Sequence, residues 1–152
     1  MLLEEFEDVA AVIEPTEKPV HDKGEVCETI ILSFNGEILK RLIESEEVYP
    51  GGYLKSINGQ HPWYIYGQGP SKLAVMLAPI GAPMIVGQLE ELVARGFKNF
   101  IILGSCGVLD HSIEADKIIL PAAALRDEGT SYHYAPPGDE VAYDESLLIE
   151  LE

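Results

Sequence analysis

Short apolar runs divide this chain into segments of strand length. Runs of this kind, rich in β-branched residues and bounded by turn residues, are typical of strands buried in an α/β sheet. They predict strands at Thr29–Phe34, Lys72–Ala78, Phe100–Leu103 and Lys117–Leu120, the last continuing past Pro121 toward Leu125.

Two other segments carry the apolar spacing of amphipathic helices. The first follows Asn35, a favoured helix cap, and ends near Glu44; its apolar positions are Ile38, Leu39, Leu42 and Ile43. The second begins at Pro83 and stops at Gly96, residue types favoured at these two ends of a helix. Gln88 falls on another face of this second helix, whose apolar stripe consists of Ile85, Leu89, Leu92 and Val93.

Turn residues in the middle of the chain predict a hairpin. Asn58-Gly59 is the strongest two-residue hairpin signal in the sequence, and it separates strand-like segments at Tyr53–Ile57 and His61–Tyr66. Pro50-Gly51-Gly52 predicts a further turn just before this hairpin.

The order of elements predicts the fold class. Strand, helix and strand between Leu73 and Leu103 form a βαβ unit, which requires parallel strands, while the hairpin adds antiparallel ones. We therefore expect an α/β fold with three αβα layers around a central mixed β-sheet. Residues 1–24 are expected to form an extended arm and residues 25–152 a single domain. A helix start at Asp144–Ser146 indicates that this domain is incomplete at its carboxyl end.

Composition narrows the class of partner. The chain has 152 residues and a net charge of -16, from 26 acidic and 10 basic side chains, which disfavours nucleic-acid binding. Two cysteines are too few for a disulfide scaffold, and they match no metal motif. Without a signal peptide or a long apolar run, we expect a cytoplasmic protein that contacts no membrane. No metal is expected, because His21, His61 and His111 do not have ligand spacing.

Two loops of small residues follow apolar strands and are candidate ligand sites. Gly104-Ser105-Cys106-Gly107 combines flexible backbone, a hydroxyl and amide groups, which suits phosphate or ribose. Ile80-Gly81-Ala82-Pro83 stands at a helix start, where amides and the helix dipole favour an anion. Taken alone, each loop is more often a plain connection between strand and helix.

A third segment, after the last apolar run, offers a cation and an aromatic ring. Arg126 is interpreted either as an anchor for a ligand or a site loop, or as the ion-pair partner of Asp127 and Glu128. Tyr134 could stack on a planar base, or pack within its proline-rich loop. Cys106 and His133 leave open a thiol nucleophile with a histidine base.

Four pieces, in this order, resemble the nucleoside phosphorylase family. The family includes uridine phosphorylases, purine nucleoside phosphorylases and adenosylhomocysteine-type nucleosidases, and the uridine branch is the most similar. The resemblance covers residues 72–152 well and residues 28–71 weakly. The pieces are Gly81 with Pro83, Glu90-Glu91-Leu92 with Gly96, the Gly-Ser-Cys-Gly loop, and Arg126 with Gly129-Thr130-Ser131 and His133-Tyr134-Ala135-Pro136.

The resemblance implies cleavage of the N-glycosidic bond of a nucleoside, with phosphate as co-substrate and no other cofactor. It assigns no catalytic residue. Phosphate and ribose contacts are implied for Gly81, Ser105, Cys106 and Gly107, with base stacking at Tyr134. It also implies a homo-oligomer that takes part in nucleoside salvage.

Three departures from the family pattern keep alternatives open. Ile102 stands where phosphorylases carry an arginine, and the Gly-Asp-Pro-x-Arg phosphate motif is absent; Met84 replaces the serine after Gly-x-Pro. The family's carboxyl-terminal part, with its Met-Glu ribose clamp, does not appear, so we expect an amino-terminal portion of the fold. The alternatives to phosphorolysis are a nucleosidase that uses water and a non-catalytic relative acting as a binding or assembly module.

Overall fold

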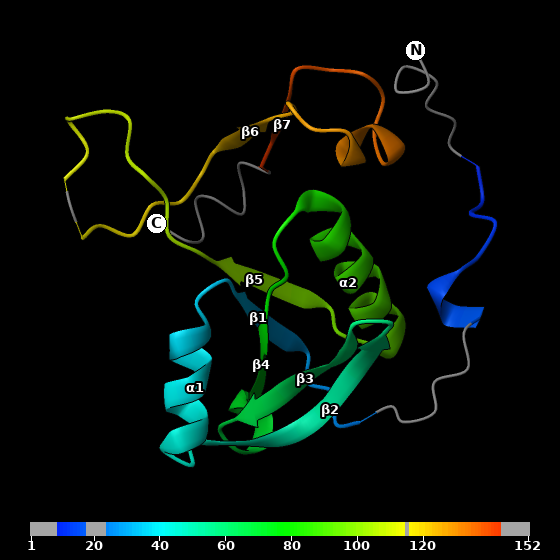
Figure 1. Ribbon diagram of the computed structural model, residues 1–152, viewed down its shortest axis with the longest axis vertical. Coiled ribbons are helices and arrows are strands. Elements are labelled where there is room, and N and C mark those ends of the chain that lie inside the picture. The colour runs from blue at the N-terminus through cyan, green and yellow to red at the C-terminus, as the bar shows by residue number, and fades with distance from the viewer. Residues whose placement is uncertain (1–8, 18–23, 115, 144–152) are drawn as a thin grey trace. The chain divides into compact units, whose positions relative to one another are not determined.

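The computed structural model describes residues 9–17, 24–114 and 116–143 (Figure 1). The chain forms two compact units, Ala11–Cys106 and a second one of Gly107–Glu152 with Met1–Ala10, and each is treated by itself. The predicted helix start at Asp144–Ser146 and much of the predicted arm lie outside the described residues, although Pro15–Glu17 form a short 3-10 helix, η2. The single domain over residues 25–152 stays a prediction.

The unit Ala11–Cys106 is built on one mixed sheet of five strands in the order β2-β3-β4-β1-β5. The inner strand β1 pairs in parallel with β4 and β5, while β3 is antiparallel to β2 and β4. This confirms the predicted mixed sheet, with its hairpin at one edge. The strands are β1 (Thr29–Ser33), β2 (Val48–Ser56), β3 (Gly59–Tyr66), β4 (Leu73–Leu77) and β5 (Asn99–Leu103), with a 3-10 turn, η3, at Gly69–Ser71.

Two helices of this unit begin and end where their capping residues predict. In α1 (Gly36–Glu44), the Asn35 side chain accepts a hydrogen bond of 3.0 Å from the amide of Glu37. In α2 (Ala82–Arg95), Gly96 adopts φ 113°, a left-handed conformation that glycine reaches without steric cost. Among the described residues, no helix is long and apolar enough to cross a bilayer.

The two helices cover opposite faces of the sheet. Neighbouring residues of a strand point to opposite faces, and one set packs with Leu92 of α2: Ile30, Leu32, Ala74 and Met76. The alternate positions face α1, since Leu77 lies 3.7 Å from the point where a Cβ on Gly36 would stand. The arrangement is the predicted αβα layering (Figure 1).

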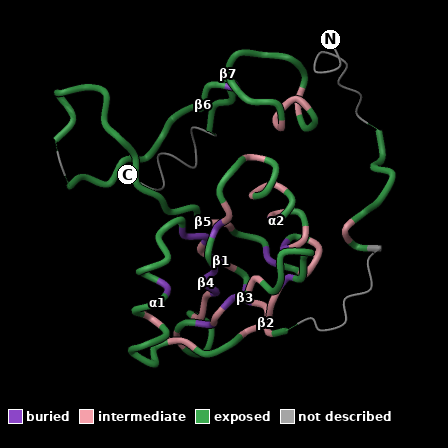
Figure 2. Tube along the Cα trace, viewed as in Figure 1, coloured by how far each residue is buried: buried purple, intermediate pink, exposed green. Residues whose placement is uncertain are grey.

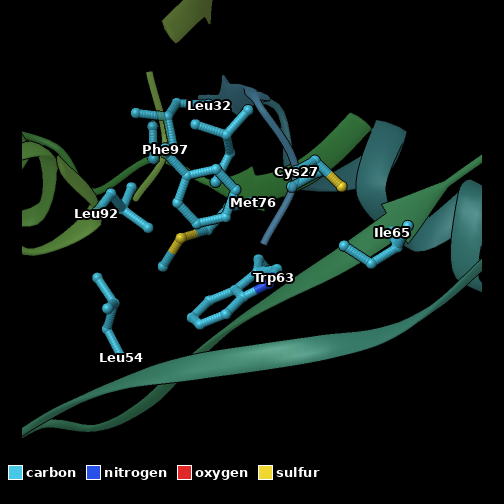
Figure 3. Close-up of a cluster of buried hydrophobic side chains, with 11 residues drawn as sticks. Cys27, Leu32, Leu54, Trp63, Ile65, Met76, Leu92 and Phe97 are labelled. Carbon is cyan, nitrogen blue, oxygen red and sulfur yellow. The ribbon is translucent and has the colours of Figure 1, made fainter. Parts of the chain in front are cut away.

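The apolar core lies on the α2 face, around the fully buried Trp63 (Figure 3). Its ring contacts that of Phe97 edge-on, with 5.7 Å between the ring centroids. Its Nε1 donates a hydrogen bond of 2.8 Å to the Glu25 carbonyl. Leu92 is buried as predicted, but Val93 is 57% exposed and Gln88 takes an inward position instead. The prediction for Val93 was therefore wrong, because residue 93 follows the buried Leu92 and is turned about 100° around α2, away from the sheet.

The turn predicted at Pro50-Gly51-Gly52 is wrong, because these residues belong to β2. The register shifts between Pro50 and Gly52, which is the mark of a β-bulge. A Cβ on Gly52 would stand 2.4 Å from the Trp63 ring, and one on Gly51 would stand 2.5 Å from its Nε1. The glycines therefore let the strand pass close over the tryptophan rather than reverse the chain.

The described part of the second unit holds a two-stranded antiparallel sheet, β6 (Ala123–Leu125) with β7 (Glu140–Ala142), and a 3-10 turn, η4 (Thr130–His133). Residues 117–120 are not in a strand, so the prediction there is wrong. Ile118 is fully exposed, and among the described residues of this unit no strand pairs with residues 117–120. Among residues 107–114 and 116–143, Arg126 alone is buried. Figure 2 shows most of this unit as exposed.

Candidate functional site

The carboxyl ends of three parallel strands meet at one edge of the sheet. Ser33 at the end of β1 is in register with Leu77 of β4 and with Leu103 of β5. Just past these ends, the Ala78 amide donates 2.8 Å to the Ser33 carbonyl, and the Phe34 amide donates 2.9 Å to the Leu103 carbonyl. The edge outside the carboxyl ends of the strands is the usual place for a ligand in such a sheet.

A cavity of about 390 Å³ lies at this edge beside Ser105. Among the described residues, no partner is found for the Ser105 hydroxyl, which is therefore available to a ligand. A Cβ on Gly104 would stand 3.3 Å from Cδ2 of Phe34, so glycine allows this loop to pack closely against the neighbouring one. The cavity is lined by Phe34, Asn35, Gly36, Glu37, Gly104 and Ser105.

Residues 34–37 of this lining were not predicted from the sequence, in which Asn35 was assigned only a capping role. The Ser33 hydroxyl accepts a hydrogen bond of 3.1 Å from the Asn35 amide, and the Asn35 side chain in turn accepts from Glu37. These bonds fix the turn that brings Glu37 to the cavity. The signal was present, because a residue that follows a parallel strand lies at the same edge as the loops after its neighbours.

The charge of the lining affects which ligand fits. Glu37 contributes a carboxylate, and no lysine or arginine is among the described residues that line this cavity. Lys40 lies 4.0 Å from Glu37, but this pair is exposed on the helix surface. The lining therefore suits a neutral, hydroxyl-rich ligand better than a dianion, which needs paired cations.

Gly81 caps the start of α2, where few amides are left for an anion. Gly81 takes φ 106°, a region that favours glycine, and its carbonyl accepts from the amides of Met84 at 3.1 Å and Ile85 at 3.0 Å. Pro83 has no N–H to offer. Gly81 is not among the residues of the Ser105 cavity, and its role on the phosphate side stays a prediction.

The Arg126 side chain forms hydrogen bonds within its own loop, residues 126–136. Its Nε donates 2.9 Å to the Ser131 hydroxyl, Nη2 donates 3.2 Å to the Ala135 carbonyl, and Nη1 donates to the Pro136 carbonyl. The guanidinium also lies 4.4 Å from the centre of the Tyr132 ring. Of the interpretations left open by the sequence, the loop anchor agrees with these contacts. No ion pair of Arg126 with Asp127 or Glu128 occurs among the described residues.

Glu128 fixes the beginning of the same loop. Its carboxylate accepts from the Thr130 amide at 2.7 Å and from the Ser131 amide at 3.0 Å, capping η4. Hydrogen bonding from Ser131, and to a lesser degree from Thr130, holds the pKa of Glu128 below its ordinary value, although desolvation opposes this. Glu128 is thus a carboxylate that stabilises a turn.

The base-stacking candidate Tyr134 follows η4 and is 53% exposed. Its amide donates 3.1 Å to the Ser131 carbonyl, so the residue that Arg126 holds also holds the backbone of Tyr134. Gly107 belongs to this same unit, whereas Ser105 and the exposed Cys106 end the other one. The convergence of Ser105 with Tyr134, like a pairing of Cys106 with His133, stays a prediction.

A metal site needs several His, Cys, Asp or Glu side chains close together. Among the described residues, no group of three such side chains is placed to hold an ion. The described cavity is therefore lined by loop backbone, the Ser105 hydroxyl, the Glu37 carboxylate, the Asn35 amide and the Phe34 ring.

Comparison with known proteins relates this chain to enzymes of one family. Three of its relatives are the uridine phosphorylases of Treponema pallidum (38% identity) and Thermococcus kodakarensis (40%) and the DeoD-type purine nucleoside phosphorylase of Caldanaerobacter subterraneus subsp. tengcongensis (25%). The matches cover 42%, 41% and 86% of this chain, but 25%, 22% and 60% of the relatives. The chain thus spans less than two thirds of their length.

A family model described as the Phosphorylase superfamily matches residues 28–152, which is most of the chain. This match extends over both units and over the loops that carried the resemblance. The predicted family is confirmed: the chain belongs to the Phosphorylase superfamily, in agreement with its similarity to nucleoside phosphorylases.

Proposed function

We propose that this protein binds a nucleoside at the carboxyl edge of its sheet and cleaves the N-glycosidic bond, transferring the ribosyl group to phosphate. One observation carries the proposal: the cavity beside Ser105, formed by the loops after parallel strands in a nucleoside phosphorylase fold. Its size of about 390 Å³ is in the range of small-molecule sites. The reaction belongs to nucleoside salvage.

In this proposal, the loop residues hold the sugar and the aromatic holds the base. Ser105, Cys106 and Gly107 contact ribose and phosphate, Gly81 lies on the phosphate side, and Tyr134 stacks on the base. The electrons of the bond between C1 and nitrogen leave with the base, which takes up a proton. The sugar gains oxocarbenium character, and a phosphate oxygen attacks C1, giving ribose 1-phosphate and free base.

Water is the second candidate acceptor, and the charge of the cavity favours it. Glu37 and the lack of a lysine or arginine among the described lining residues disfavour a phosphate dianion. A carboxylate can instead accept a proton from an attacking water molecule. The products would then be free ribose and free base.

The test is release of base from uridine, inosine and adenosine, each with and without phosphate. Phosphorolysis predicts release that requires phosphate, and hydrolysis predicts release that does not. Nucleoside binding without release would indicate the non-catalytic relative, and absence of binding in calorimetry would overturn the proposal. Ser105→Ala should lower nucleoside affinity roughly tenfold by removing one ligand hydrogen bond, while Ser71→Ala, a matched control, should leave it unchanged.

The setting of the activity is also a proposal. We place the protein in the cytoplasm as a homo-oligomer whose partners are a nucleoside and phosphate. Size-exclusion chromatography with light scattering tests the oligomer, and a mass equal to that of one chain would contradict it.

A further inference from the structure

A second cavity, separate from the one beside Ser105, lies in the unit Ala11–Cys106 against α2. Its volume is about 240 Å³, and the hairpin end of β2 and β3 forms its other wall. No residue lining it also lines the Ser105 cavity. The apolar part of its lining consists of Pro15, Leu54, Pro79, Pro83 and Met84.

Gln88 lines this cavity and carries an unsatisfied polar atom. The residue is 8% exposed, and among the described residues no partner is found for its Oε1. Its Nε2 lies 3.5 Å from the sulfur of Met76, a weak acceptor. Because a thioether cannot donate, the amide is correctly oriented with nitrogen toward sulfur, and the open position is an acceptor. A buried acceptor without a donor is costly, and a ligand that supplies an N–H or O–H would remove this cost once the amide turns toward the cavity.

Gly87, the preceding residue, keeps the wall of the cavity open. It lies inside α2, where glycine is less favourable than alanine, and its φ is not in the left-handed region. A Cβ there would meet no heavy atom within 4 Å, so close packing does not require glycine. A longer side chain at this position would occupy the space that the cavity leaves.

The hairpin side of the cavity presents a fixed polar pair. The Ser56 hydroxyl and Nε2 of His61 are 2.8 Å apart, and the Asn58 amide donates 3.1 Å to the same hydroxyl. These bonds tie the two strands together next to the turn. The cavity therefore has a defined polar rim opposite the amide of Gln88.

We propose that this cavity binds a small planar heterocycle whose N–H donates to Oε1 of Gln88 while its ring packs on Met84 and the prolines. The terminal torsion of glutamine is soft, so the amide can turn toward such a ligand and give up only its contact with sulfur. A cavity of about 150 Å³ is enough for benzene, so about 240 Å³ accommodates a two-ring heterocycle. The proposal does not rest on glycosidic-bond cleavage.

Indole and benzofuran form a matched pair of probes, since they have nearly the same shape and only indole donates an N–H. Titration of the full chain, followed by NMR chemical shifts or calorimetry, should show indole binding about fivefold more tightly, the worth of one hydrogen bond. Gln88→Leu should remove this preference and retain binding of both. Gln68→Leu, a glutamine outside the cavity, should change neither affinity.

Gly87→Met tests whether both probes bind in this cavity. Its side chain grows into open space on a helix that it favours, so it should fold and abolish binding of both probes. This variant also decides the question if Gln88→Leu does not fold. Equal affinity for the two probes, no binding of either, or undiminished binding in Gly87→Met would overturn the proposal.

Discussion

The two units of the molecule are organised by different forces. In Ala11–Cys106, the buried residues are mostly apolar and form one cluster around Trp63. In the described part of the other unit, residues 107–114 and 116–143, the single buried residue is Arg126, a charged one. One unit is stabilised by removal of apolar surface from water, and the other by saturation of one cation with hydrogen bonds.

The difference teaches where each unit is vulnerable. An apolar cluster is stabilised by many contacts. Truncation of one side chain therefore lowers the free energy of unfolding in proportion to the volume that is lost. A guanidinium that serves three acceptors concentrates the interaction, so its removal leaves several polar groups unpaired at once. The substitutions below test this contrast, beginning with the largest expected effect.

Trp63→Ala should be the most damaging substitution for the apolar unit. It leaves a large cavity in the centre of the cluster and removes a hydrogen bond to Glu25, which together should lower the free energy of unfolding by about 3–5 kcal/mol. Since Trp63 is the single tryptophan of the chain, urea unfolding should be followed by circular dichroism rather than fluorescence. Trp63→Phe should cost less; an equal cost would mean that volume does not govern this unit.

Arg126→Met should release the loop it anchors while leaving the sheet of the other unit intact. Loss of charge-assisted hydrogen bonds should destabilise the loop by about 1.5–3 kcal/mol. Hydrogen exchange should rise at Ser131 and Tyr134 and stay unchanged in β1 and β4.

Arg126→Lys is the matched variant for that experiment. Lysine keeps the charge but not the planar fork that reaches three acceptors, so it should restore little of the protection. Full rescue by lysine would show that charge alone organises the loop. The contrast between the units would then be one of electrostatics rather than of hydrogen-bond geometry.

Gly87→Ala tests the apolar unit in the opposite direction. Alanine is the better helix former, and its Cβ meets open space at this position, so stability should rise by about 0.5–1 kcal/mol. Thermal unfolding followed by circular dichroism would detect the gain. A loss would mean that α2 is constrained at this point by a contact that the open space does not reveal.

The smallest effect concerns a polar group at the edge of the apolar unit. Glu25 accepts hydrogen bonds from Lys72 and, at 3.2 Å, from Tyr49; the bond from Lys72 is the main cause that lowers the pKa of Glu25. A depressed carboxyl pKa stabilises the fold above the unfolded-state value, near 4.3, and this contribution is lost as pH falls through the folded-state value.

Lys72→Met should therefore lower the melting temperature at pH 6 and leave it nearly unchanged at pH 3. Thermal melts across this range, with Lys55→Met as the exposed control, would measure the difference. A loss of equal size at both pH values would assign the effect to packing of the lysine stem rather than to its charge.

The contrast between the units also explains what the sequence could predict. Strands β1 and β4, helix α2 and the hairpin follow from apolar periodicity and turn residues, because apolar burial dominates there. The failures have local causes. Lys117–Leu120 has the composition of a strand, but it has no partner strand among the described residues of its unit. Pro50–Gly52 has the composition of a turn, but its glycines instead let β2 pass close over Trp63.

The candidate site was predicted in part. Ser105, which lines the cavity, could be named because small residues after a strand are a local signal. Arg126, which anchors its loop, could be named because a charge at the end of an apolar run stands out. Glu37 was missed because its place at the cavity depends on which strands are neighbours. That order is a property of the sheet, and no single segment of sequence contains it.

The departure of α1 and α2 to opposite sides of the sheet has an evolutionary consequence. Phe34 and Glu37 line the Ser105 cavity but stand outside the cluster around Trp63, so replacements there should alter what the cavity accepts at little cost to folding. The sheet thus separates the residues that carry stability from those that meet a ligand, and each set is free to evolve without the other.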